Sequence, residues 1–183
     1  MFSRNQAKLY IIAQTLSKKE QDKMDISPTT YAFATLIALL GFFVGMFLAK
    51  MVPEELKSGL EYFVILKKML LLAIFVLFVN IIEFSFLLKI LIYTLIVLLF
   101  AMIDLMPFQL YMLLTFLLLL AAPVTSNFFI QVSLVFLYGL PAGTLYSIEN
   151  MKDSFKRLVS RASMELLPAV LFIIFFVFLW LKV

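Results

Sequence analysis

The chain has 183 residues, of which 64% are hydrophobic, and its 15 basic and 11 acidic residues give a formal net charge of +4. It contains neither cysteine nor histidine, which excludes disulfides, thiolate nucleophiles, iron–sulfur clusters and histidine-ligated zinc or haem. With no recognisable catalytic or nucleotide-binding motif either, the sequence predicts neither an enzyme nor a bound cofactor or metal.

Residues 1–28 predict an amphipathic helix that lies on a membrane surface. Apolar side chains recur there at helical spacing, while the bases lie elsewhere around the helix. The apolar positions are Phe2, Leu9, Ile12, Ala13 and Leu16. The first 19 residues hold four bases and no acid, which is also typical of organellar transit peptides. Because neither a secretory apolar core nor a small-residue cleavage site follows, we favour the interfacial helix.

A first membrane-spanning helix is expected over residues 30–49. It contains a stripe of small residues at spacings of three and four, so that they share one face of the helix. These residues are Ala34, Ala38, Gly41, Gly45 and Ala49. Small side chains allow a second helix backbone to approach closely. We therefore predict that this face packs against another helix.

The next part of the chain predicts a second interfacial helix over residues 52–67, which begins at Pro53 and ends at Lys67–Lys68. An apolar block follows over residues 69–103. About 20 residues cross the hydrocarbon core of a bilayer, so this block is too long for one span and short for two. A hairpin that turns near residues 83–85 would give the chain six spans, whereas one long tilted helix would give five.

The last part of the chain predicts a short apolar helix over 108–122, spans over 128–146 and 166–181, and a third interfacial helix over 147–165. The segment 139–143 has two interpretations. It either breaks the helix and frees carbonyl groups, as in transporters, or it marks the helix end near Leu140. The predicted fold is an all-α polytopic membrane protein with about six (alternatively five) transmembrane helices, several of them short, and three amphipathic interfacial helices. Residues 29–183 form its single membrane domain.

Polar side chains within the apolar segments are candidates for function, because they are costly in hydrocarbon. Asn80 and Glu83 share a helix face on which they could bind a cation or relay a proton. Alternatively, Glu83 lies among head groups at a hairpin tip. Asp104 lies three residues before Pro107, and we interpret it as a turn residue in preference to an ion ligand. The candidate polar path comprises Asn80, Glu83, Asp104, Gln131, Gly139, Pro141 and Gly143.

A group of bases lies off the apolar face of the expected third interfacial helix. The group consists of Lys152, Lys156, Arg157 and Arg161. Basic side chains in this position suit contact with anionic lipid head groups or with an acidic partner.

These features lead us to expect a multi-pass protein of a cell inner membrane or an organellar membrane. Its expected partners are the bilayer and other membrane subunits, and not nucleic acid. The leading hypothesis is a non-catalytic subunit or scaffold of a membrane protein complex, held by helix packing and interfacial helices. The alternative is a small transporter or permease subunit that uses the candidate polar path. An enzyme acting on lipid has less support, because the chain lacks an aspartate cluster for divalent metal.

Overall fold

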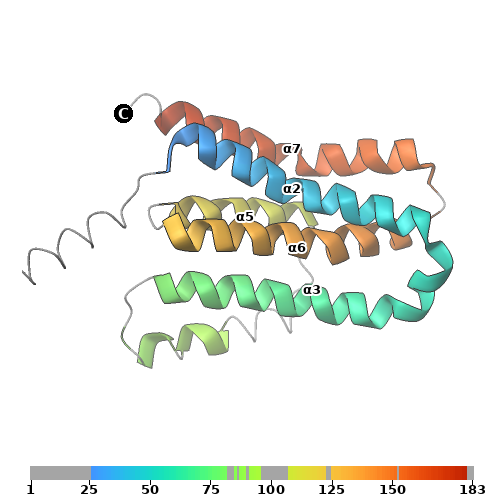
Figure 1. The fold of residues 1–183 in the computed structure, drawn as a ribbon, viewed down its shortest axis with the longest axis horizontal. Helices are drawn as coiled ribbons and strands as arrows, with labels where there is room; N and C mark the ends of the chain where they lie inside the picture. Colours follow the sequence, from blue (N-terminus) through green and yellow to red (C-terminus); the bar gives the residue numbers. More distant parts are fainter. Residues whose placement is uncertain are drawn as a thin grey trace, which may run out of the picture.

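A computed structural model describes residues 26–81, 85, 87–89, 91–95, 107–122, 125–151 and 153–180. The predicted N-terminal amphipathic segment therefore lies almost wholly outside the described residues. Throughout the described part the secondary structure is helical, with short turns between helices. Five helices are labelled in Figure 1: α2 (Pro28–Met51), α3 (Pro53–Ile81), α5 (Pro107–Ala121), α6 (Thr125–Glu149) and α7 (Phe155–Trp180).

Four of these helices are long and apolar enough to cross a membrane, namely α2, α3, α6 and α7. The fifth, α5, has 15 residues and extends about 22 Å at 1.5 Å per residue. The all-helical class is confirmed for the described residues, whereas the predicted count of six spans is not.

Helices α2 and α6 run parallel at the centre of the bundle. Tyr31 of α2 packs against Phe128 at one end, with ring centroids 5.9 Å apart. At the other end, Lys50 donates hydrogen bonds to the carbonyl groups of Met151 and Asp153, at 3.3 and 3.2 Å. These two bonds fix the turn between α6 and α7 to the end of α2.

The other helices pack around this pair (Figure 1). Helix α3 packs against α6, α7 packs against α2 and α5, and α5 also contacts α6. Helix α7 runs antiparallel to α2, because Trp180 lies near Tyr31 and Phe155 lies near Phe47. Aromatic side chains fill the core where three helices meet. Phe42 of α2 and Tyr138 of α6 both contact Tyr111 of α5, at centroid distances of 5.4 and 5.9 Å.

The predicted interfacial helix over 52–67 is not a separate element, since α3 continues without interruption from Pro53 to Ile81. The prediction of a separate helix depends on a helix end at Lys67–Lys68. Lysine is a good helix former, however, and no glycine or proline follows it in α3, so the helix has no local reason to stop there. The lysine pair, Lys67 and Lys68, consequently lies near the middle of α3.

The apolar block over 69–103 is not one long helix, because α3 ends at Ile81 and Ser85 is not helical. The chain then returns along α3: residues 87–89 and 91–95 are helical, and the Tyr93 hydroxyl donates to Asn80 Oδ1 at 3.0 Å. A reversal between Ile81 and residue 87 agrees with the predicted hairpin, although Glu83 at its expected tip lies outside the described residues.

Both interpretations of segment 139–143 are wrong, because α6 runs through it as a continuous helix to Glu149. The third interfacial helix over 147–165 is also not a separate element. A turn divides that range, and α7 then continues from Phe155 through Pro168 to Trp180. Proline within a helix removes one backbone hydrogen bond and bends the helix, and α7 changes direction near its middle in Figure 1.

Candidate functional site

The close contact between α2 and α6 determines where the other helices can lie. Each helix carries two glycines four residues apart: Gly41 and Gly45 on α2, and Gly139 and Gly143 on α6. A Cβ atom added at any of the four would collide with the backbone of the opposite helix. The two backbones are therefore in direct contact at this glycine crossing. The geometry requires glycine for space and not for backbone conformation, since no described glycine has a positive φ.

A buried hydrogen bond accompanies the glycine crossing. The Thr144 hydroxyl donates to the carbonyl oxygen of Gly45 at 3.1 Å. The rest of the small-residue stripe, Ala34, Ala38 and Ala49, is also buried. The stripe thus faces α6 of the same chain. Gly139 and Gly143, which the sequence interpretation assigned to a helix break, form the other half of this contact.

A cavity of about 590 Å³ lies between α3 and α6, and we call it the α3–α6 cavity. Helix α3 presents Leu60, Val64, Lys67 and Lys68 to it on successive turns. Helix α6 contributes residues spaced three and four apart, which again share a helix face. They are Tyr138, Ala142, Leu145, Tyr146 and Glu149, with Ile148 beside them, and Leu110 of α5 completes the lining.

The polar groups of the α3–α6 cavity differ in their surroundings. Lys67 is half-buried and Lys68 is exposed, whereas the tyrosines Tyr138 and Tyr146 are buried. The Tyr146 hydroxyl donates to Glu165 Oε1 of α7 at 3.0 Å, which joins the wall of the cavity to a third helix. Glu149 is the last residue of α6 and is exposed. The lining therefore combines two cationic groups with one carboxylate and two phenols.

Two buried polar side chains have no hydrogen-bond partner among the described residues. Tyr111 packs against Tyr138, and its hydroxyl is buried with no hydrogen-bond partner among the described residues. Both polar atoms of the Gln131 side chain are likewise buried and unpaired within that part of the chain. Buried polar groups are normally satisfied, so these two positions are exceptions within the described core.

The remaining residues of the candidate polar path do not converge on one site. Asn80 is exposed and accepts the hydrogen bond from Tyr93. Glu83 and Asp104 lie outside the described residues. Pro141 is buried inside the continuous α6. Among the described residues, no group of three side chains suited to hold a metal ion is found.

The described bases of the predicted basic group are exposed, and one of them, Arg161, contacts polar side chains of the turn before α7. Lys156 and Arg157 are exposed, and Lys152 lies outside the described residues. Arg161 donates to Asn150 Oδ1 at 3.2 Å and lies 3.8 Å from an Asp153 carboxylate oxygen. Because Arg161 is largely exposed and Asp153 is partly exposed, this ion pair contributes little to stability.

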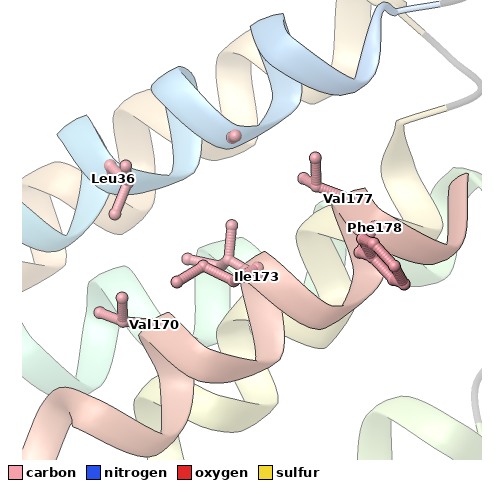
Figure 2. A pocket seen from close by; sticks show the side chains of 7 residues that line it. Leu36, Val170, Ile173, Val177 and Phe178 are labelled. Carbon is pink, nitrogen blue, oxygen red and sulfur yellow. The ribbon is translucent and has the colours of Figure 1, made fainter. Parts of the chain in front are cut away.

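Two further cavities lie between α2 and α7, and their linings are nearly or wholly apolar. One has a volume of about 300 Å³ and is lined by residues that include Leu36, Val170, Ile173, Val177 and Phe178 (Figure 2). The other has a volume of about 480 Å³, and Ser163 is its one polar lining residue. Neither offers charged groups that could orient a ligand.

The chain matches no known protein family, curated protein or solved structure in the comparisons that we made. The geometry of the described residues is therefore the basis for the function proposed below. Sequence reasoning missed the α3–α6 cavity because it placed the lysine pair at a membrane surface. The sequence does contain one indication of this cavity, because Lys67 and Lys68 lie at the centre of a segment that can form one long helix.

Proposed function

We propose that the chain is a multi-pass integral membrane protein that acts as a non-catalytic subunit of a membrane complex. The proposal rests on how unevenly the helices cover one another. We compared the buried share of an 18-residue apolar stretch in each of these four helices. It is 50% in α2 and 61% in α6, but only 17% in α3 and 22% in α7. The central pair is in close contact at its glycines, whereas most residues of α3 are at least partly exposed.

The outward side of α3 is apolar and aromatic. Its exposed residues include Tyr62, Ile65, Leu66 and Met69. Such a surface requires cover from lipid or from another protein. We propose that a helix of a second subunit covers it, with van der Waals packing as the main attraction, as between membrane helices generally.

The test uses the absence of cysteine from the chain. A Met69→Cys variant, labelled with a maleimide photo-crosslinker and irradiated in the source membrane, should yield one adduct with a second polypeptide. The matched control is Phe33→Cys on α2, because Met69 and Phe33 are 65% and 69% exposed. We expect the control to give no such adduct. Lipid adducts alone at both positions, together with a lone chain in native mass spectrometry, would reject the proposal.

Transport is a second candidate, favoured by the α3–α6 cavity and by the buried polar groups of Tyr111 and Gln131, which have no hydrogen-bond partner among the described residues. The segment 139–143 no longer supports this function, because its glycines are used in helix packing. Purified protein in liposomes should then dissipate an imposed gradient of protons or sodium ions, and Gln131→Leu should abolish the flux. If the wild-type protein gives no flux above empty liposomes, ion transport is rejected.

A further inference from the structure

The lysine pair of α3 lies where positive charge is costly unless something neutralises it. Both residues fall well inside Ser58–Ile81, the part of α3 that is long and apolar enough to cross a membrane. Neither forms an ion pair or hydrogen bond with another residue in the described ranges. Ionisable groups within spanning helices usually face a bundle interior or a ligand site, and Lys67 and Lys68 both line the α3–α6 cavity.

The lining of this cavity falls into two chemical parts. Lys67, Lys68 and the phenol of Tyr138 can donate hydrogen bonds to an anion. The rest of the wall is mainly aliphatic, with Leu60, Val64, Leu110, Ala142 and Leu145. With Glu149 as its one carboxylate, the lining carries a net charge of +1. A ligand that satisfies both parts has one negative charge and an apolar chain.

We propose that the α3–α6 cavity binds an amphiphile with a singly charged anionic head group, of the phosphodiester type found in lipids. The lysine pair binds the head group, and the aliphatic wall covers the beginning of an acyl chain. A volume of about 590 Å³ is too small for a whole two-chain lipid. The remainder of the ligand therefore extends outward between α3 and α6. The carboxylate of Glu149 disfavours head groups with further negative charges.

This site does not depend on the chain being a subunit of a complex, so failure of one proposal leaves the other standing. Two simpler ligands fit the lining less well. A free inorganic anion would make no use of the aliphatic wall, and an uncharged lipid would leave both lysines without a counter-charge.

The test measures lipid binding to the purified full-length chain in a neutral detergent, by native mass spectrometry during titration with phosphatidylglycerol. Phosphatidylcholine serves as the zwitterionic comparison. We expect one tightly held phosphatidylglycerol and no tightly held phosphatidylcholine. Lys67→Gln with Lys68→Gln should weaken phosphatidylglycerol binding by about tenfold or more, the factor typical of one charge-assisted hydrogen bond.

The matched control is Lys156→Gln with Arg157→Gln, which removes the same charge from exposed positions of α7 and should leave the affinity unchanged. Val64→Phe tests the apolar part separately, because it fills the cavity while both lysines remain. It should also weaken binding. Equal affinities for the two lipids, or an unchanged affinity in the lysine variant, would overturn the proposal. Displacement of the lipid by millimolar inorganic phosphate would overturn it in favour of a small-anion site.

Discussion

An alanine at the glycine crossing should destabilise the protein, although alanine normally stabilises a helix. A Cβ atom at Gly139 would lie 2.5 Å from the Phe42 nitrogen and 2.6 Å from the carbonyl carbon of Gly41. Carbon atoms in contact are normally about 3.5–4.0 Å apart, so the two helices would have to separate by about 1 Å. The obstructing atoms belong to the backbone and cannot rotate away.

The size of the effect follows from two opposing terms. Overpacking of a well-filled contact costs roughly 1–3 kcal/mol, while replacing glycine by alanine within a helix gains about 0.5–1 kcal/mol. The difference lies between about 0 and 2.5 kcal/mol, and we expect Gly139→Ala to lower the free energy of unfolding by about 1 kcal/mol, near the middle of that range. Gly59 of α3 provides the control, because its added Cβ would meet only the Phe63 side chain, at 3.6 Å. Gly59→Ala should raise the free energy of unfolding by about 0.5–1 kcal/mol.

The measurement is unfolding of each variant in mixed micelles, with helix content followed by circular dichroism during titration with a denaturing detergent. The two substitutions are chemically identical, so general effects of alanine cancel in the comparison. If Gly139→Ala is as stabilising as Gly59→Ala, then α2 and α6 do not approach closely and the reasoning is refuted.

Three further substitutions can be measured in the same unfolding assay. Thr144→Val should lower the free energy of unfolding by about 0.5–1 kcal/mol, because it removes the buried hydrogen bond to the Gly45 carbonyl. An unchanged free energy of unfolding would show that this bond is not formed. Lys50→Met should lower the free energy of unfolding by about 1–2 kcal/mol, since two carbonyl groups of the turn between α6 and α7 lose their donor. A decrease below about 0.5 kcal/mol, on the order of experimental error, would contradict the contact. Pro141→Ala should leave the protein folded and at least as stable, because α6 is continuous there, whereas loss of folding would indicate a required break.

The sequence was sufficient to predict the helical class and several helix positions. The expected helices over 30–49 and 108–122 correspond to α2 and α5, because each is bounded by a proline or a polar turn. At the start of α2, Ser27 accepts a hydrogen bond from the Thr30 amide at 3.1 Å and Pro28 occupies the first turn, which is a local signal.

The errors arose where tertiary contact overrides a local signal. Gly139, Pro141 and Gly143 would weaken an isolated helix, but in α6 the glycines are covered by α2 and the helix persists. The pairing of Gly41 and Gly45 with them joins positions almost one hundred residues apart, and a single sequence does not contain that information. Charge usually marks a membrane surface, so Lys67 and Lys68 predict a helix end, and that prediction hides the cavity that they line.

The most direct test of this structure asks whether the small-residue face of α2 packs within one chain. Ala49 and Ser147 are both buried, and each lies four residues after a glycine of the crossing, Gly45 on α2 and Gly143 on α6, so we expect them to face each other one turn further along. An Ala49→Cys, Ser147→Cys double variant has no other cysteine, and its disulfide formation can be followed by gel mobility under mild oxidation. The structure predicts that the disulfide forms within the monomer and that its yield does not change when the protein is diluted. Disulfide-linked dimers without any intramolecular product would contradict it, because the stripe would then pair different copies of the chain.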